Sequence, residues 1–329
     1  MVRITRTVKF TPAISERSAS AAAAVLACVV LSAVPARAVL FDSTGDPAFN
    51  TTAPGGALAG SGWQYEGTFG GFLATPIGPN YFLAAKHIGG SIGSTLVYSG
   101  NTFITDAFVD SPNSDLRIWH VTGTFSTYAP LYTGTDVIGK SLVVFGRGNE
   151  RGADVTLGGN LVGWQWSGGP NLQRWGTNTV TGRPDLGAAY GTTIYATFDH
   201  NAGTNEATLS VGDSSGGVFI QDPADSVWKL AGVNLGVDGP FATDASGTGS
   251  FNAALFDMRG YYVQDAGGTY NLVSGASPVP AGFYATEIAA NLPFILSTIP
   301  EPSSCCALIV GVFTLASLRR RHFPAKWEV

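Results

Sequence analysis

The central part of this sequence contains no cysteine. The chain has 329 residues, and its three cysteines all lie near its ends, at Cys28, Cys305 and Cys306. Residues 39–299 therefore have neither a disulfide framework nor a cysteine-based zinc site. A stretch of this length, about 260 residues, can be stabilised by its hydrophobic core alone.

Charged residues are also scarce, at 12% of the chain. The basic ones are rarest in the middle, because residues 39–299 contain nine lysines and arginines against 20 acidic residues, a net charge of −11. An acidic body without a cluster of basic residues argues against nucleic acid or an anionic membrane surface as a partner.

Long apolar runs are missing except at the two ends. Near the amino terminus, residues 19–34 are almost wholly apolar, and Pro35 and the small residues Ala36 and Ala38 follow them. Four basic residues precede or border the run: Arg3, Arg6, Lys9 and Arg17. This order is typical of a secretory signal peptide, so we predict that residues 1–38 are removed by cleavage after Ala38. The alternative is an uncleaved anchor helix.

The other apolar run, residues 305–318, follows Pro300-Glu301-Pro302 and precedes an arginine cluster at residues 319–321. Fourteen residues at about 1.5 Å each barely span a bilayer core. The three-part pattern over residues 300–329 resembles the PEP-CTERM sorting tail of Gram-negative bacteria. That resemblance implies transient membrane insertion, processing by an exosortase-type enzyme, and delivery to the cell surface or matrix. An ordinary tail anchor is the alternative.

What the middle does contain is many short apolar runs separated by Gly, Pro, Asn and Asp, as in YFLAA, LRIWHVTG and SLVVFGRG. Short alternating runs at this spacing predict an all-β domain, either an antiparallel barrel or a sandwich. One segment, residues 281–296, has apolar residues at near-helical spacing and predicts a C-terminal helix. Residues 266–280, rich in Gly, Ser and Pro, are expected to form the loop before it.

Only three histidines lie in the middle, at His87, His120 and His200. His87 ends the strand-like run of YFLAAKH and is followed by glycines. His120 is expected to pack on a strand and His200 to lie in a loop. No spacing of these residues predicts a metal site, and no cofactor is implied.

Two further motifs follow His87 along the chain. Asp115 opens a strand in SPNSDLRIW, and residues 212–217 read GDSSGG. A serine hydroxyl is a weak nucleophile that needs a histidine to take its proton and a carboxylate to orient that histidine. Taken alone, GDSSGG is also a good hairpin turn.

In the order His, Asp, Ser, these motifs resemble the trypsin/chymotrypsin family of serine proteases over roughly residues 60–296. The resemblance implies a chymotrypsin-like double antiparallel β-barrel with a short C-terminal helix, and a serine endopeptidase domain at residues 39–299. It also implies that Ser214 attacks a peptide bond, that His87 moves the proton, and that Asp115 orients the histidine. Protein or peptide substrates follow from it.

Placing GDSSGGV on the family's Gly-Asp-Ser-Gly-Gly-Pro-Val without gaps puts Ser214 at the nucleophile. Counting back from the two glycines instead selects Ser215, at the cost of an insertion. With Ser214 as the nucleophile, the backbone N–H groups of Gly212 and Ser214 would form the oxyanion hole, whereas the Ser215 alternative puts Asp213 where the family has its oxyanion glycine. Thr208 stands where the trypsin branch has an aspartate at the base of its specificity pocket. A preference for Lys or Arg is therefore not expected, and a small or apolar side chain is.

Three departures from the family pattern bear on activity. Lys86 stands directly before the histidine, and Ser215 replaces a glycine. The sequence VLFD that begins at Val39 does not match the new amino terminus that activates family members, so we expect Asp213 to find another partner. Lys86 and Ser215 leave open the alternative of a catalytically silent surface-binding protein on the same barrel. A different serine hydrolase, such as an esterase, is a second alternative, because GDSSG formally matches its Gly-x-Ser-x-Gly motif.

Overall fold

The computed structural model describes residues 39–168, 172–265 and 267–299. The predicted signal peptide and sorting tail lie outside the described residues. In these ranges no helix is both long and apolar enough to cross a membrane. The described chain is built mainly from antiparallel strands and has one α-helix, α1 (Ile288–Thr298), near its end.

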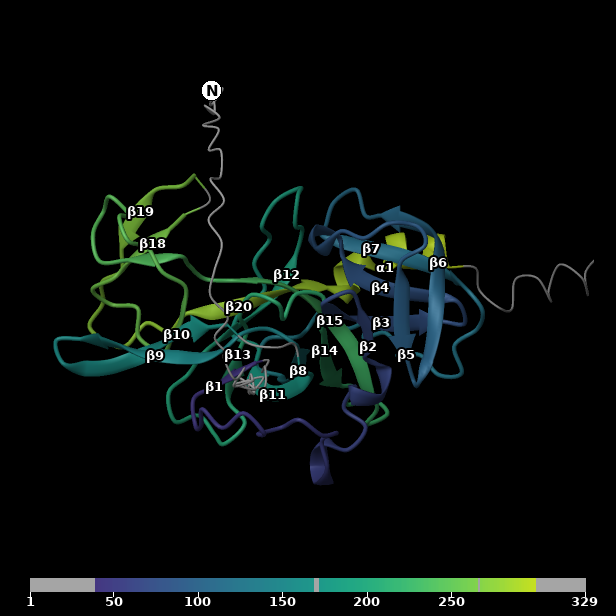
Figure 1. Cartoon of the computed structure of the whole chain (residues 1–329), viewed down its shortest axis with the longest axis horizontal. Helices are drawn as coiled ribbons and strands as arrows, with labels where there is room; N and C mark the ends of the chain where they lie inside the picture. Colours follow the sequence, from purple (N-terminus) through teal and green to yellow (C-terminus); the bar gives the residue numbers. More distant parts are fainter. Residues whose placement is uncertain (1–38, 169–171, 266, 300–329) are drawn as a thin grey trace, which may run out of the picture. The chain divides into compact units, whose positions relative to one another are not determined.

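Six strands close into a first barrel in the order β2-β3-β4-β7-β6-β5 (Figure 1). Their bounds are β2 (Gly67–Phe69), β3 (Phe72–Gly78), β4 (Tyr81–Ala85), β5 (Thr95–Tyr98), β6 (Asn101–Asp110) and β7 (Leu116–Thr122). The barrel is filled by a cluster that includes Phe69, Phe82 and Trp119. Their rings pack with centroids 5.2–6.2 Å apart, in the range that aromatic pairs prefer.

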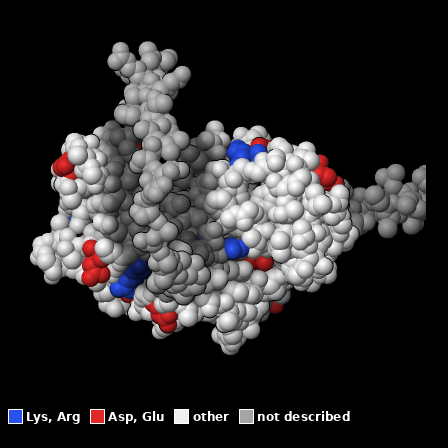
Figure 2. All heavy atoms as spheres, in the orientation of Figure 1, with Lys and Arg blue, Asp and Glu red and all other residues white. Residues whose placement is uncertain are grey.

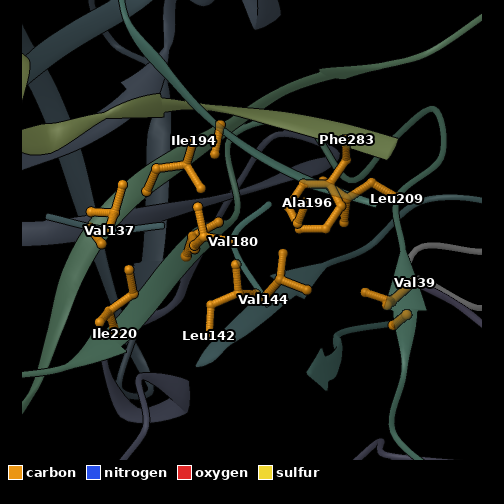
Figure 3. Packing of buried hydrophobic residues seen from close by; sticks show 14 of the residues in the cluster. Val39, Val137, Leu142, Val144, Val180, Ile194, Ala196, Leu209, Ile220 and Phe283 are labelled. Atoms are coloured by element: carbon orange, nitrogen blue, oxygen red, sulfur yellow. The ribbon is translucent and has the colours of Figure 1, made fainter. Parts of the chain in front are cut away.

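A second sheet has the order β11-β8-β14-β15-β20-β12. Its strands are β8 (Ser141–Gly146), β11 (Arg174–Thr179), β12 (Thr193–Thr197), β14 (Gly217–Gln221), β15 (Trp228–Val237) and β20 (Gly282–Glu287). The outer strands β11 and β12 are not paired with each other, but the chain just after β11 reaches β12 through the bridge Gly182↔Tyr195. Aliphatic side chains such as Leu142, Val144 and Ile220 fill this half-barrel (Figure 3). The predicted chymotrypsin-like double barrel is thus confirmed.

Smaller elements extend the second sheet on its far side from the first barrel. They form the sheet β9 (Glu150–Leu157), β10 (Asn160–Ser167) and β17 (Ala253–Leu255), and the sheet β16 (Phe241–Ala242), β18 (Tyr262–Gln264) and β19 (Tyr270–Leu272). Near the start of the chain, β1 (Leu40–Phe41) pairs with β13 (Ala207–Thr208). Three short 3-10 helices complete the list: Gly56–Leu58, Trp63–Tyr65 and Lys86–Ile88.

Two expectations about the end of the chain need correction. The segment predicted as one helix from residue 281 to 296 divides into strand β20 and helix α1, which begins only at Ile288. Sheet pairing of residues 282–287 with both β12 and β15 overrides the weak helical spacing. The predicted loop 266–280 also contains strand β19.

A buried carboxyl group lies where the two barrels meet. Glu66 is 8% exposed, and its Oε1 accepts hydrogen bonds from Thr75 Oγ1 of the first barrel and from the backbone N–H of Gly217 in the second. Its Oε2 has no hydrogen-bond partner among the described residues. Burial raises the pKa of Glu66 from 4.5 to about 8, so the folded protein keeps this group protonated at neutral pH.

The high pKa of Glu66 predicts a pH-dependent stability. Between pH 4.5 and 8 the unfolded chain loses the Glu66 proton and the folded protein keeps it, so stability falls as pH rises through this range. Glu66→Gln removes the titration and keeps the acceptor oxygen. We expect the variant to exceed wild type by roughly 2–5 kcal/mol at pH 9 and to match it near pH 4. Urea unfolding at several pH values measures this, and a pH-independent difference would contradict it. Asp136→Asn, at an exposed position, is the control.

Candidate active site

His87 lies in the 3-10 helix Lys86–Ile88, which directly follows strand β4. The two alanines before this helix are buried, so the backbone packs closely against its surroundings. After it, Gly90 has a φ of +100°, and a Cβ there would lie 3.0 Å from the rings of Phe69 and Trp119. Only glycine satisfies both conditions. The chain therefore turns sharply and leaves the His87 side chain 38% exposed at the barrel surface.

Asp115 lies just before strand β7 and is 3% exposed. Its Oδ2 is 2.5 Å from Nδ1 of His87, and its Oδ1 accepts the backbone N–H of the same residue at 3.0 Å. One carboxylate thus holds both the ring and the main chain of the histidine. Such a contact fixes which ring nitrogen carries the proton and leaves Nε2 free to act as an acceptor.

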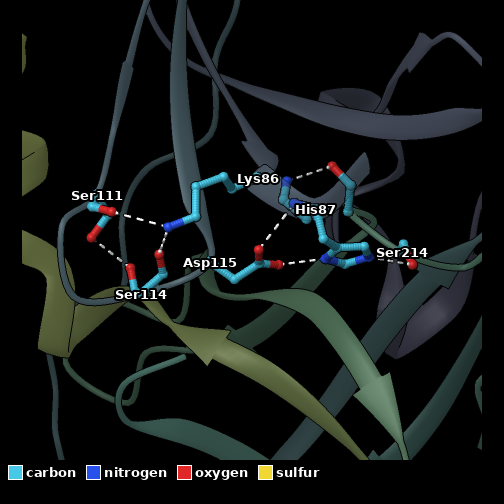
Figure 4. Close-up of polar contacts among 8 residues, drawn as sticks. Lys86, His87, Ser111, Ser114, Asp115 and Ser214 are labelled. Atoms are coloured by element: carbon cyan, nitrogen blue, oxygen red, sulfur yellow. Dashed lines mark hydrogen bonds and ion pairs between the residues drawn. The ribbon is translucent and has the colours of Figure 1, made fainter. Parts of the chain in front are cut away.

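Ser214 comes from the second half of the chain, in the turn before β14. Its Oγ lies 2.9 Å from Nε2 of His87, on the opposite side of the ring from Asp115 (Figure 4). The structure therefore brings together the three side chains singled out in the sequence, although they are up to 127 residues apart. They come from both barrels, because His87 and Asp115 belong to the first and Ser214 to the second.

The neighbouring hydroxyl has a different position. Ser215 is fully buried, and its Oγ accepts the backbone N–H of Ala85 at 3.0 Å. Its φ is +70°, a region that favours glycine, which is the residue the family pattern has at this point. The hydroxyl of Ser215 thus links the second barrel to the end of β4, whereas the hydroxyl of Ser214 faces the histidine.

Two backbone N–H groups beside Ser214 lack a partner among the described residues. These are the amides of Gly212 and Ser214. Gly212 has a φ of +100°, and a Cβ there would lie 2.8 Å from the Cα of Gly148. A side chain is therefore excluded on both conformational and steric grounds. The turn leaves these two donors available to a developing negative oxygen.

The carboxylate of Asp213, between these residues, is buried and heavily hydrogen-bonded. It accepts the backbone N–H groups of Gly148 and Ser210, both at 2.7 Å, and the hydroxyl of Ser210 at 3.0 Å. Gly146 and Gly148, in the segment Gly-Arg-Gly, make room for this carboxylate, since a Cβ at either position would collide with its oxygens. Burial raises the pKa of Asp213 to about 6, although these hydrogen bonds oppose the rise.

A fourth donor to Asp213 corrects one expectation. The backbone nitrogen of Val39 lies 3.3 Å from its Oδ1, so Asp213 does pair with the residue that follows the predicted cleavage site. Val39 is fully buried and is held by pairing of β1 with β13. The sequence did not predict this contact because Val39 and Asp213 are 174 residues apart, and nothing in VLFD indicates that the two residues meet.

A small cavity of about 140 Å³ opens beside Ser214. Its lining is mostly apolar and comes from strand β10, from the turn before β14 and from the end of β15: Trp166, Leu209, Ser210, Val211, Asp213, Ser214, Asn234, Leu235, Gly236 and Val237. Thr208, predicted to lie in the specificity pocket, does not line this cavity. It is buried in β13, where it pairs with Leu40.

The other two histidines lie away from Ser214 and each contacts a different aspartate. His120, on β7, is within hydrogen-bonding distance of Asp106, and His200 of Asp42. His200 also borders a larger cavity of about 800 Å³ that does not include the His87, Asp115 or Ser214 side chains. Within residues 39–168, 172–265 and 267–299, no three His, Cys, Asp or Glu residues are grouped as metal ligands.

No protein-family model and no curated protein matches this sequence. Among solved structures, mouse neuropsin, a serine protease, is similar at a TM-score of 0.46 and 12% identity, covering 73% of this chain and 96% of neuropsin. Rv3671c of Mycobacterium tuberculosis, in the inactive form of its Ser343Ala mutant, is similar at 0.42 and 15%, covering 78% and 97%.

The passenger domain of the plasmid-encoded toxin, an autotransporter enterotoxin of enteroaggregative Escherichia coli, is similar at a TM-score of 0.42 and 15% identity. The match covers 69% of this chain but only 21% of the toxin domain. Because all these TM-scores lie below 0.5, the function is inferred from the geometry of the site itself.

The contact between Val39 and Asp213 predicts a stability effect of the chain start. A protein that begins at Val39 carries an α-ammonium group in place of the amide, and charge-assisted hydrogen bonds are roughly twice as strong as neutral ones. We expect this protein to be more stable at pH 7.5 than one that keeps Arg37 and Ala38, by roughly 1–3 kcal/mol.

The same comparison in the Asp213→Asn background supplies the control. There the gain from starting at Val39 should largely disappear, because the charged partner is gone. Urea unfolding of the four proteins gives the coupling energy. A coupling energy near zero would show that the amino group does not pair with Asp213.

Proposed function

We propose that this protein is a serine endopeptidase in which Ser214, His87 and Asp115 form the catalytic triad. The observation that carries the proposal is the continuous line of contacts from Asp115 through the imidazole to the Ser214 hydroxyl, at 2.5 and 2.9 Å. Ser214 Oγ attacks the scissile carbonyl carbon while Nε2 of His87 takes its proton. The carboxylate of Asp115 stabilises the imidazolium ion that results.

The remaining steps use the same groups. The tetrahedral intermediate collapses to an acyl-enzyme as the imidazolium gives its proton to the leaving amine. Water, deprotonated by Nε2, then hydrolyses the ester and regenerates Ser214. The N–H groups of Gly212 and Ser214 are the donors for the negative oxygen. In such sites one donor contributes about 3–4 kcal/mol to transition-state stabilisation.

A peptide is the substrate class that the neighbouring strand favours. The pairing of β14 with β15 runs only to Val233. Among the described residues, residues 235–237 then have a neighbouring strand, β20, on one side only. These residues also line the cavity beside Ser214. An extended peptide can add to such an edge by main-chain hydrogen bonds and place one side chain in the cavity.

The cavity favours an apolar side chain on the residue before the cut bond. Its one carboxylate, Asp213, already accepts hydrogen bonds from three other residues. Its volume of about 140 Å³ is close to that of a protein cavity known to accept benzene, about 150 Å³. Leu, Met and Phe side chains therefore match it in size and polarity.

We also propose that residues 1–38 direct export and that residues 300–329 act as a sorting tail processed by an exosortase-type enzyme at the cell surface. Both proposals rest on the sequence alone. Figure 2 shows few basic side chains on this face of the molecule, and they are scattered. This agrees with a protein, rather than a nucleic acid, as the binding partner. A catalytically silent binding protein remains the alternative, and the following experiment separates the two.

Labelling with a fluorophosphonate probe should identify the nucleophile. Wild type should label, and Ser214→Ala should not, because the hydroxyl beside His87 is gone. Ser215→Ala should still label, at a cost of roughly 1 kcal/mol in stability from the lost bond to Ala85. In-gel fluorescence and thermal unfolding measure the two effects. Absence of labelling in the wild type, both full-length and beginning at Val39, would support the silent binder. Labelling without peptide hydrolysis would support an esterase.

Digestion of a peptide library should show cleavage after Leu, Met or Phe. Gly236 lines the cavity, and a Cβ there meets nothing within 4 Å, so Gly236→Val should fold and narrow the cavity. We expect it to lower kcat/KM for these residues by about 10-fold relative to alanine. Gly55→Val, also in open space, is the control. Cleavage mainly after Lys or Arg would refute the assignment.

A further inference from the structure

The turn that carries Asp115 is held from two sides. Ser111, Ser114 and Asp115 are each at most 3% exposed, although the turn is made of polar residues. The backbone N–H of Ser111 closes the turn onto Leu116 O, and the hydroxyl oxygens of Ser111 and Ser114 lie 2.7 Å apart, where Ser114 accepts the hydroxyl proton of Ser111. The position of the Asp115 carboxylate therefore depends on what fixes this buried turn.

Lys86 fixes it from the side of His87. Its Nζ donates to the carbonyl oxygens of Ser111 at 3.2 Å and Ser114 at 2.9 Å (Figure 4). Its backbone N–H also donates to the carbonyl of Asp115 at 2.7 Å. An ammonium group has three donors and no acceptor, which suits two carbonyls that accept no other hydrogen bond from the residues that the structure describes.

Helix α1 fixes the turn from the other side. The hydroxyl of Ser114 donates to Oδ1 of Asn291 at 2.7 Å, and the Nδ2 of Asn291 donates to the carbonyl of Glu287. Asn291 is 8% exposed, so this contact is buried. Helix α1 thus contacts the turn on one side, and Lys86 contacts it on the side of His87.

We propose that Lys86 is a positioning residue of the active site, whose ammonium group holds the Asp115 turn in register with the adjacent His87. This inference rests on the proposed function. The Lys86 side chain ends on the turn and not on the imidazole, so the residue acts through Asp115. It follows that the lysine preceding the histidine supports the triad and does not mark a silent site.

The test compares the kinetics of Lys86→Met and Lys86→Arg on a peptide with leucine before the cut bond. Methionine reproduces the lysine side chain as far as Cε but has no ammonium donor, so the turn loses its side-chain tie to the His87 segment. We expect kcat to fall about 10- to 100-fold with KM within about 2-fold of wild type, because misplacement of a catalytic group affects the transition state most. Arginine keeps donors at this place and should restore at least a third of wild-type kcat.

Lys229→Met is the matched control. The Lys229 ammonium pairs with Asp222 and Asp225 in the β14–β15 hairpin, and its removal should leave kcat unchanged. Circular dichroism confirms that each variant is folded. If Lys86→Met does not fold, Lys86→Ala, which also lacks a donor, takes its place under the same criterion of a reduced kcat at constant KM.

The outcomes separate this inference from the proposed function. Wild-type kcat in Lys86→Met would overturn the positioning role and leave the peptidase intact. An equal loss in the methionine and arginine variants would also overturn it, because the donors would then be irrelevant. A wild type that neither labels with fluorophosphonate nor hydrolyses the peptide would overturn the peptidase itself, and the role of Lys86 with it.

Discussion

The buried carboxylate of Asp213 is the interaction on which the site depends. Its oxygens accept hydrogen bonds from the backbone N–H groups of Gly148, which follows β8, of Ser210 before the turn, and of Val39, the residue before β1. These contacts hold residues 212–216 in a shape that no hydrophobic packing would select, with positive φ at Gly212 and Ser215. In that shape the Ser214 hydroxyl faces His87, and its backbone N–H has no partner among the described residues. Burying this carboxylate costs desolvation free energy, and its hydrogen bonds stabilise a turn whose backbone torsions are themselves unfavourable.

The sequence predicted the β-rich fold and located the three residues that meet, because each side chain stands beside small residues or glycines that its position requires. It favoured Ser214 over Ser215 because Ser214 needs no insertion in the motif, but it could not show which hydroxyl faces the histidine. The decision depends on contacts with His87 and Ala85, which lie in the other barrel. The start of α1 was missed for a related reason, as residues 282–287 are made a strand by partners on both sides.

What could not be predicted depends on residues distant in sequence. The partner of Asp213 is Val39, and the tie between the barrels at Glu66 joins residues 151 positions apart. Thr208 was predicted to lie in the specificity pocket by counting back from the serine. In the structure it lies in β13, paired with Leu40, and does not line the cavity. Lys86 looked unfavourable because it adjoins the histidine in sequence. In the structure the side chain leaves the site and ends on the carbonyls of residues 111 and 114.

Val39 has a φ of 58°, a left-handed conformation that a β-branched residue adopts only under constraint. This torsion exists only while a peptide bond joins residues 38 and 39. Hydrolysis of that bond abolishes the torsion together with its energetic cost, while leaving the buried side chain where it is. Cleavage at this bond would therefore remove the backbone strain at Val39. An uncleaved precursor would have to adopt this unfavourable torsion on folding, whereas a chain that begins at Val39 would not.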